Sequence, residues 1–300
     1  MDFQMPITLR QLEIFDKVAA CGHVTQASRQ LLLTQSAVSM AIAEFERLAG
    51  APLFERQGRR LLLNDRGRLI LPQAREVLQN IRKIEQFLDE SAAQPKGVLQ
   101  VGASTTIGNY LLPALVGHFS HLYPTAKAQL KVGNAQQIEE DLERGELDIG
   151  LSEGLPHARS LQAEPWRHDE LVLVVGPTHA WASRREATLD MLAGAAWIMR
   201  ERGSGTREIF EAALSKKGVD CRVALELGHT EAIKKAAEAG LGVGCLSRMA
   251  VQRELEHGWL VEISSPLDLR RTLVILRRRS EQSTRLLQAF LALLKAEGDY

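Results

Sequence analysis

Apolar residues recur every three or four positions through roughly the first 90 residues, which predicts a run of helices. A first helix should extend from Leu9 to about Ala20. Residues 25–42 should form two short amphipathic helices joined by a tight turn, each opened by a threonine, Thr25 or Thr34, that can cap it. The second of these helices should end at Gly50, a helix-stop residue.

The second helix of this pair divides its residues between a polar and an apolar side. Its start carries the hydrogen-bonding side chains of Gln35, Ser36 and Ser39, whereas Val38 and Ile42 suit a packed interior. This division is typical of a helix that packs its back on its own domain and reads base edges in a major groove with its N-terminal end. The alternative is an ordinary helical hairpin, and the residues that follow favour the DNA-reading interpretation.

A short, arginine-rich hairpin should come next. Two apolar runs in residues 52–64 flank a turn that contains Gly58, which indicates a small β-hairpin or wing. Five arginines and a single acid, Asp65, lie between Arg56 and Arg68. Beside a helix that reads DNA, such a turn is better explained by contacts to phosphates than by a solvated loop.

A long helix beginning near Asp65, a plausible cap, carries a narrow apolar seam. The seam residues are spaced alternately four and three apart: Ile70, Ala74, Val77, Ile81, Ile84 and Leu88. Because this heptad seam is too narrow for a globular core face, it predicts pairing with the same helix of a second subunit. Pro72 should bend the helix near its start, and residues 91–97 should form a linker.

From Val98 onward, short apolar runs alternate with helical segments. This alternation predicts parallel sheets with helices on their faces, in two similar α/β lobes joined by crossing strands. Such an arrangement resembles a hinged solute-binding clamshell. The first lobe is expected to contain strands at 98–103, 128–132 and 147–151 and helices at 107–122 and 136–144. The second unit begins near Glu170, and a strand at 271–276 and a helix at 283–295 close the chain.

Composition narrows the class of protein. The 300 residues suffice for two or three domains, and 37 Lys and Arg balance 37 Asp and Glu, so any surface that binds a polyanion must be local. Cys21, Cys221 and Cys245 are too widely spaced to suggest a disulfide framework or a zinc site, which fits a reducing cytoplasm. We find no secretory signal or bilayer-long apolar run, so we expect a cytoplasmic protein without a membrane partner.

The sequence carries no pattern that points to catalysis. The eight histidines show no metal-ligand or triad spacing, and no nucleophile–base pair stands out. Gly240, Gly242 and Gly244 superficially match a dinucleotide loop, but they fall between a helix and the following strand, which is the reverse of the required order. We therefore expect no enzyme activity, no catalytic or metal-binding residues and no cofactor.

Polar residues gather in four loops that should meet at the hinge between the lobes. They are Ser104, Thr105 and Thr106; Asn134; Arg202, Ser204, Gly205 and Thr206; and His229, Thr230 and Glu231. Each loop precedes a helix, so its hydroxyls and free amides suit an anion, although each alone could be a helix cap without a ligand. Four such loops at one hinge favour a site for a small-molecule effector.

The loop chemistry suggests an effector that is an inorganic oxyanion, such as sulfite or sulfate, or a short carboxylate. Glycines and small hydroxyls let a ligand approach closely, and Arg202 adds a positive charge. Glu153, which follows a buried strand, complicates this hypothesis, because a carboxylate repels an anion unless Arg202 or another cation neutralises it.

In the order of its parts, the whole chain resembles the LysR-type transcriptional regulators. The residues that carry the resemblance are Leu9–Glu13 with Phe15, Gln26–Ser28, Thr34–Ser39, Leu53–Arg56, Gly58–Arg60, Leu63 and Gly67. Carried over onto this sequence, the family's DNA contacts fall on Thr34, Gln35, Ser36, Ser39, Arg56 and Arg59. The loop at 202–206 looks like that of family members tied to sulfur or carbon assimilation.

The resemblance implies a bacterial homodimer, commonly assembled as a homotetramer, that binds an interrupted palindromic operator in double-stranded DNA and acts with RNA polymerase. It also implies three parts. They are an all-α winged helix-turn-helix domain (1–64), a linker and dimerisation helix (65–92), and a two-lobed α/β periplasmic-binding-protein-like effector domain (93–300). Lobe I should span about 97–167 and 268–300, and lobe II about 168–267. The rival interpretation, a cytoplasmic solute-binding sensor without DNA function, accounts for residues 98–300 alone.

Overall fold

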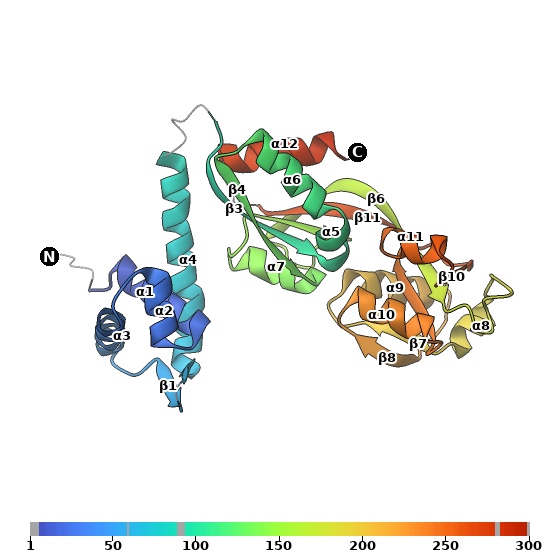
Figure 1. The fold of residues 1–300 in the computed structure, drawn as a ribbon, viewed down its shortest axis with the longest axis horizontal. Helices are drawn as coiled ribbons and strands as arrows, with labels where there is room; N and C mark the ends of the chain where they lie inside the picture. Colours follow the sequence, from blue (N-terminus) through green and yellow to red (C-terminus); the bar gives the residue numbers. More distant parts are fainter. Residues whose placement is uncertain (1–5, 59, 89–93, 280–282, 299–300) are drawn as a thin grey trace. The chain divides into compact units, whose positions relative to one another are not determined.

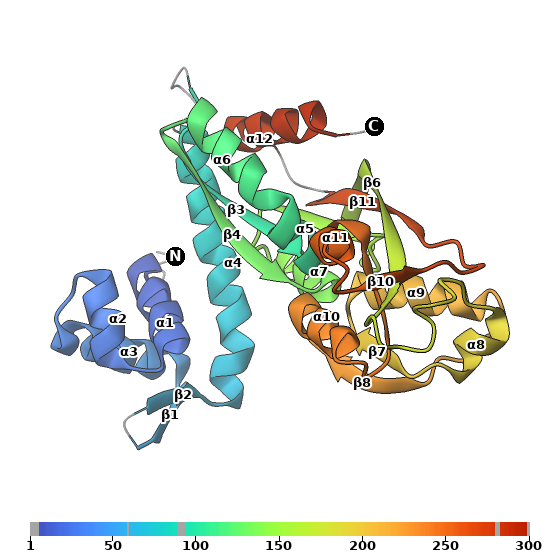
Figure 2. The same cartoon turned by 45° about the vertical axis from the view of Figure 1, so that its right-hand side comes forward.

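The computed structural model describes residues 6–58, 60–88, 94–279 and 283–298, and its elements are drawn in Figures 1 and 2. The chain divides into two compact units. One comprises Met1–Asp89 with Arg144–Glu146, and the other comprises Glu90–Glu143 with Leu147–Tyr300. No helix among the described residues is long and apolar enough to cross a bilayer.

The first unit is a winged helix-turn-helix with the predicted order of elements. They are α1 (Leu9–Cys21), α2 (Val24–Leu31), α3 (Gln35–Ala49), β1 (Phe54–Gln57), β2 (Arg60–Leu63) and α4 (Asp65–Leu88). Phe15 is fully buried at the centre of this unit and packs edge-on against Phe45 and Phe54. Since Phe45 lies on α3 and Phe54 on β1, this aromatic cluster joins the helices to the wing.

The caps of these helices match the prediction in one case and differ in two. Thr34 caps α3 as predicted, because its Oγ1 accepts a hydrogen bond from the backbone N–H of Ala37 (3.2 Å). The expected cap at Thr25 is wrong: α2 begins at Val24, two residues before the helix that Thr25 would cap, and has His23 as its N-cap. At α4, the side chain that accepts the capping hydrogen bond from Gly67 N belongs to Asn64 (2.9 Å) and not to Asp65.

Two sets of hydrogen bonds attach the wing to the helices. The Glu46 carboxylate of α3 accepts hydrogen bonds from the backbone N–H groups of Leu53 and Phe54 (2.7 and 3.2 Å). The backbone N–H of Leu61 in β2 donates to the carbonyl of Gly22, in the turn between α1 and α2 (2.8 Å). These bonds attach the start of β1 to the later part of α3, and β2 to the turn between α1 and α2.

The predicted seam along α4 is divided between two environments. Ala74 is buried and Ile70 is partly buried, and both pack on the core of the winged domain. Farther along the helix, Val77 and Ile84 are 42% and 53% exposed. The helix continues through Pro72. The first turns of the seam therefore belong to the core of their own domain. The spacing in the sequence could not distinguish this part of the seam from the exposed part.

The second unit is built on one mixed sheet whose strand order is β4-β3-β5-β11-β6-β9-β7-β8, with β10 paired to β6. Its strands are β3 (Gly97–Ser104), β4 (Ala126–Gly133), β5 (Ile149–Glu153), β6 (Leu161–Val175), β7 (Trp197–Arg200), β8 (Val223–Leu227), β9 (Val243–Ser247), β10 (Val261–Ile263) and β11 (Arg270–Arg278). Strand β3 pairs in parallel with β4 and β5, and β7 pairs in parallel with β8 and β9. The predicted parallel pairing in both halves is confirmed.

Two long strands, β6 and β11, connect the two halves of this sheet. They run antiparallel and side by side (Figures 1 and 2), with Arg271 opposite Asp169 and Leu276 opposite Ala163. The first part of β6 pairs with β11, and its later part pairs with β9 and β10. We call the half around β3–β5 lobe I and the half around β7–β9 lobe II.

Helices cover both faces of each lobe, as parallel sheets require. They are α5 (Thr105–Tyr110), α6 (Leu112–Leu122), α7 (Ala135–Glu143), α8 (Leu189–Gly194), α9 (Gly205–Ser215), α10 (Thr230–Glu238), α11 (Arg248–Glu256) and α12 (Arg285–Ala296). The helix predicted at 107–122 is two helices, because Pro113 favours the first turn of a new helix and cannot continue an old one. Neither α11 nor β10 was predicted, since α11 buries only Ala250 and Val251.

Candidate DNA-binding surface and effector cleft

Helix α3 presents a polar face to solvent. Gln35, Ser36 and Ser39 are exposed, and Met40 beside them is 72% exposed. The hydroxyl of Thr34 also lies 3.1 Å from that of Ser36. The opposite face carries the buried side chains of Val38, Ile42 and Phe45. The helix therefore leaves its N-terminal polar residues free for a ligand while its back holds the domain together.

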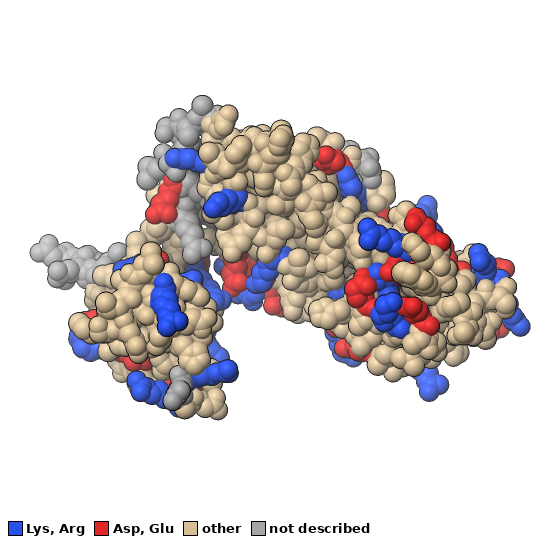
Figure 3. Space-filling view, viewed as in Figure 1, with Lys and Arg blue, Asp and Glu red and all other residues tan. Residues whose placement is uncertain are grey.

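A groove of about 750 Å³ lies between the start of α2, the start of α3 and the wing. Its lining includes Gln35 and three arginines, Arg29, Arg56 and Arg60. None of these three guanidinium groups makes an ion pair with any described residue, whereas Arg10, Arg47 and Arg68 each pair with an acid one turn away. The groove thus has uncompensated positive charge, and Lys and Arg also gather over the wing in Figure 3.

The sequence prediction identified part of this surface. Arg59 lies outside the described residues. Arg29 was not predicted, because it belongs to α2 and only the fold brings that helix beside the wing. Arg60 was within the arginine run but was not singled out. What Arg29, Arg56 and Arg60 share in the structure is that none of them pairs with an acid among the described residues, and only the fold shows this.

The centre of the junction between the lobes is a buried arginine that the sequence analysis missed. Arg271 of β11 has a side chain that is 1% exposed. Its Nε donates to Asp169 Oδ2 (2.6 Å), its Nη1 to Thr206 Oγ1 (3.0 Å) and its Nη2 to Thr106 Oγ1 (3.4 Å). Because Thr106 starts a lobe I helix and Thr206 starts a lobe II helix, Arg271 connects two of the four predicted loops.

Glu153 lies beside this arginine at the end of β5, and its side chain is 3% exposed. Its Oε1 is 3.5 Å from Arg271 Nη1. Its Oε2 lies close to α9, because a Cβ placed on Gly205 would be 3.0 Å from it. The cation nearest the negative charge of Glu153 is therefore Arg271 and not Arg202. The sequence had left open that a cation other than Arg202 plays this part.

Two serines near the carboxyl ends of neighbouring strands are buried. Their hydroxyl oxygens have no hydrogen-bond partner among the described residues. The two residues are Ser104 at the end of β3 and Ser152 in β5, which are 3% and 1% exposed. The register of β3 on β5, with Ala103 opposite Leu151, sets them on neighbouring strands. Buried hydroxyls without partners are rare, and a bound ligand is one explanation for them.

A second set of contacts joins the lobes beside Arg271. Arg200 of β7 donates to Thr105 Oγ1 (3.1 Å) and forms two hydrogen bonds with Glu201 (2.8 and 2.9 Å). Burial alone would raise the pKa of Glu201, but the Arg200 hydrogen bonds and charge, with help from Asn134, hold it below its ordinary value. The backbone N–H of Gln136 also donates to the carbonyl of Gly203 (3.1 Å).

The fourth predicted loop meets lobe I through α5. The Tyr110 hydroxyl donates to Glu231 Oε1 (3.2 Å), and Lys234 lies 2.5 Å from the same oxygen. Burial raises the pKa of Tyr110. Thr230 is buried at the start of α10, whereas His229, its N-cap, is exposed and makes no capping hydrogen bond with its side chain. The structure thus brings Thr230 and Glu231 to the junction but leaves His229 at its margin.

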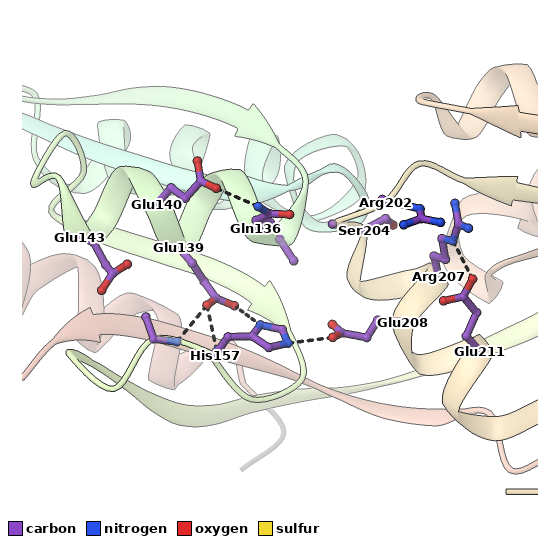
Figure 4. Close-up of a pocket in the computed structure, with 13 residues that line it drawn as sticks. Gln136, Glu139, Glu140, Glu143, His157, Arg202, Ser204, Arg207, Glu208 and Glu211 are labelled. Atoms are coloured by element: carbon purple, nitrogen blue, oxygen red, sulfur yellow. Dashed lines mark hydrogen bonds and ion pairs between the residues drawn. The ribbon is translucent and has the colours of Figure 1, made fainter. Parts of the chain in front are cut away.

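A groove of about 750 Å³ follows the junction between α7 and α9, as Figure 4 shows. Arg202 and Ser204 line it together with five glutamates, Glu139, Glu140, Glu143, Glu208 and Glu211. His157 bridges the lobes there, because its Nε2 lies 2.7 Å from Glu208 Oε1 and its Nδ1 lies 3.4 Å from Glu139 Oε1. The hydrogen bond to Glu208 is the largest of the contributions that raise the pKa of His157.

Comparisons with known proteins agree over both units. Residues 9–68 match the family described as the bacterial regulatory helix-turn-helix protein, lysR family, and residues 92–299 match the LysR substrate binding domain. The HTH-type transcriptional regulator YeiE of Escherichia coli K12 is 44% identical over 288 residues, which cover 96% of this chain and 97% of YeiE. The regulator CbbR of Rhodospirillum rubrum is 34% identical over 292 residues, or 97% of each chain.

Solved structures show the same fold. The regulatory domain of CcmR from Synechocystis PCC6803, in complex with 2-PG, has a TM-score of 0.63 and 31% identity, and the match covers 68% of this chain and 98% of that one. Full-length CbnR complexed with its target DNA has a TM-score of 0.72 at 20% identity and covers 97% of this chain and all of CbnR. The chain belongs to the LysR family: it is a DNA-binding transcriptional regulator with a helix-turn-helix domain and a two-lobed effector-binding domain.

Proposed function

We propose that this regulator controls transcription in response to a small anion held at the junction between the lobes of its effector domain. The observation that carries the proposal is Arg271, a buried cation whose guanidinium joins Thr106 of lobe I to Thr206 of lobe II. A ligand bound beside it contacts both lobes, so its binding energy can favour one relative arrangement of the lobes over another.

The chemistry at this junction favours an anion. Besides Arg271, it offers the unpartnered hydroxyls of Ser104 and Ser152 and the N-terminal end of the eleven-residue helix α9 at Ser204. Glu153 packs against Gly205 beside these groups. Hydroxyls, a guanidinium and a helix start are groups that suit an inorganic oxyanion or a short carboxylate. The related CcmR domain was solved with 2-PG (2-phosphoglycolate), itself a small anion.

A calorimetric titration of the full-length protein tests the effector class. We expect at least one of sulfite, sulfate, phosphate and a series of short carboxylates to bind with a defined stoichiometry. Changing Arg202, an exposed arginine at the margin of the junction, to Gln should leave that affinity nearly unchanged. Binding restricted to amines or aromatic compounds contradicts the proposal.

We propose further that Gln35, Ser36 and Ser39 contact base edges, while Thr34 and the groove arginines contact phosphates. The support is the exposed polar face of α3 and the unpaired charge of Arg29, Arg56 and Arg60 beside it. Arg59 belongs to the same proposal on sequence grounds. A solute-binding protein without DNA function does not account for residues 9–68, which match the lysR helix-turn-helix family.

Changing Ser36 or Ser39 to Ala should weaken binding to the cognate operator by about 1–3 kcal/mol, because each change removes a hydroxyl that reads a base. Fluorescence anisotropy with an operator duplex, found by sequencing genomic fragments that the protein retains, measures the loss. Ser215→Ala, on an exposed turn of the effector domain, is the matched control. Wild-type affinity in both α3 variants refutes their assignment to the reading surface.

Pairing through α4 to form a homodimer is also part of this proposal, supported by the exposed Val77 and Ile84. Assembly into a homotetramer, an interrupted palindromic operator and contact with RNA polymerase remain predictions from the family resemblance. The cytoplasm is the compartment in which such a regulator would meet DNA.

A further inference from the structure

We propose that Glu153 makes the junction select anions that also carry a hydrogen-bond donor, and reject anions of the same shape and charge that carry none. Hydrogen phosphate and hydroxycarboxylates belong to the first class, and sulfate belongs to the second. The inference rests on the proposed small-anion site and specifies its ligand chemistry.

The first support is the lack of donors around the Glu153 carboxylate. Its side chain is 97% buried, yet it accepts no hydrogen bond from the described residues. Arg271 lies 3.5 Å away at its nearest atom, and its closer hydrogen bonds go to Asp169, Thr206 and Thr106. An ionised carboxylate has only acceptor sites, and no described protein group fills those of Glu153, so they are open to a hydrogen-bond donor. A ligand that donates a hydrogen bond satisfies them.

The second support is the position of Glu153. A Cβ on Gly205 would lie 3.0 Å from Glu153 Oε2 and 3.2 Å from Glu153 Cβ, so the side chain rests on the first turn of α9. Ser204 and Thr206 flank this contact, and Thr206 is itself bonded to Arg271. Any anion that reaches this helix start beside Arg271 therefore lies next to the carboxylate.

The charge balance of the cluster leads to the same conclusion. The contacts join one cation, Arg271, to two carboxylates, Asp169 and Glu153. Asp169 is satisfied on both oxygens, because Ser247 donates to its Oδ1 (2.9 Å) and Arg271 to its Oδ2. Glu153 is thus the carboxylate that an incoming anion meets. Its charge repels every anion, but an anion with an O–H group offsets the repulsion by donating a hydrogen bond to it, whereas an anion without a proton does not.

Sites built to hydrogen-bond a ligand hydroxyl discriminate strongly against an analogue that lacks it. Phosphate and sulfate form a suitable pair at mildly alkaline pH, because both are tetrahedral dianions and only phosphate retains a proton. Glycolate and propionate form a second pair, in which a methyl group replaces the hydroxyl. We expect calorimetry on the full-length protein to show about 100-fold or stronger preference for phosphate over sulfate, in line with such discrimination, and a preference of the same sign for glycolate.

Glu153→Gln tests the residue itself. The amide can donate as well as accept, so the variant should bind sulfate more tightly than the wild type does, and the phosphate-to-sulfate ratio should fall towards one. Glu153→Asp retains the carboxylate and should retain the preference at reduced affinity. Glu164→Gln removes a lobe I carboxylate that pairs with Lys295 and should leave the ratio unchanged. A purely structural role of Glu153 at the start of α9 would alter thermal stability without changing the phosphate-to-sulfate ratio.

The outcomes separate this inference from the proposal on which it rests. Equal binding of phosphate and sulfate by the wild-type protein overturns it and leaves the small-anion site in place. An unchanged ratio in a folded Glu153→Gln variant also overturns it. If Glu153→Gln does not fold, the wild-type ratios for the two ligand pairs decide. Failure of every tested anion and short carboxylate to bind refutes the anion site, and the selectivity filter with it.

Discussion

Replacing Arg271 by Met should lower the free energy of unfolding of the effector domain by about 3–5 kcal/mol, because removing one partner of a buried ion pair leaves an uncompensated charge. Asp169 would lose its bond to Arg271 Nε, and Glu153 would lose its nearest cation. The same change removes the side chain that joins Thr106 to Thr206. On the proposed function, the response of DNA binding to a small anion should therefore disappear as well.

Urea denaturation followed by circular dichroism measures the loss of stability, and operator binding with and without the effector measures the loss of response. Arg270→Met is the matched control, because Arg270 is the neighbouring residue but its ion pair with Asp268 is exposed. It should leave the denaturation midpoint and the response close to those of the wild type. Adding Asp169→Asn to Arg271→Met should recover part of the lost stability by removing one unpaired charge. A midpoint unchanged by Arg271→Met contradicts the assignment.

If the protein forms the homodimer proposed above, replacing Ile81 by Asp should yield monomers, because it sets a charge in the apolar seam of α4 between Val77 and Ile84. A monomer holds one operator half-site at a time. Its affinity for the full operator should therefore fall on the order of 10³-fold, towards the affinity for unrelated DNA.

Size-exclusion chromatography with light scattering gives the oligomeric state, and anisotropy with the operator duplex gives the affinity. Asn80→Asp adds the same charge one residue earlier, outside the seam and on an exposed position, and should leave the dimer intact. A dimer that persists in the Ile81→Asp variant shows that pairing uses another surface. The variant's helical content should match that of the wild type in either case, because Asp at one exposed turn does not break a helix of this length.

Sequence periodicity predicted most of the fold because it indicates which secondary structure each short segment forms. The polar face of α3, its Thr34 cap and the alternation of strands and helices in both lobes all follow from spacing within one element. The division of the α4 seam did not follow, because Ile70 and Ala74 are buried by other elements of the winged domain. Helix α11 was missed because it is short and mostly polar.

The sequence predicted the loops at the junction between the lobes but not the arginine at its centre. Thr106, Gly205 and Thr206 belong to segments in which hydroxyl and glycine residues open a predicted helix, a pattern that the sequence shows directly. The structure brings these segments together. Arg271 is the second residue of β11, and it meets Asp169 only because β11 pairs with β6, about one hundred positions away in the chain. Arg202, the cation chosen from the sequence, is exposed at the margin. Pairings across strands so distant cannot be read from local spacing.

The path of the chain through the two lobes has a consequence for synthesis on the ribosome. Strand β11 lies between β5 and β6 in the middle of the sheet, and α12 packs on the lobe I core, yet both follow the strands of lobe II in the chain. The strands of lobe II around β7–β9 emerge before them. Lobe II can thus pair β7, β8 and β9 while lobe I still lacks β11, the neighbour of β5. A nascent or truncated chain that ends before Arg270 would expose the edges of β5 and β6. Exposed strand edges can pair with other chains, so this risk of misassembly ends only when β11 has paired with both strands.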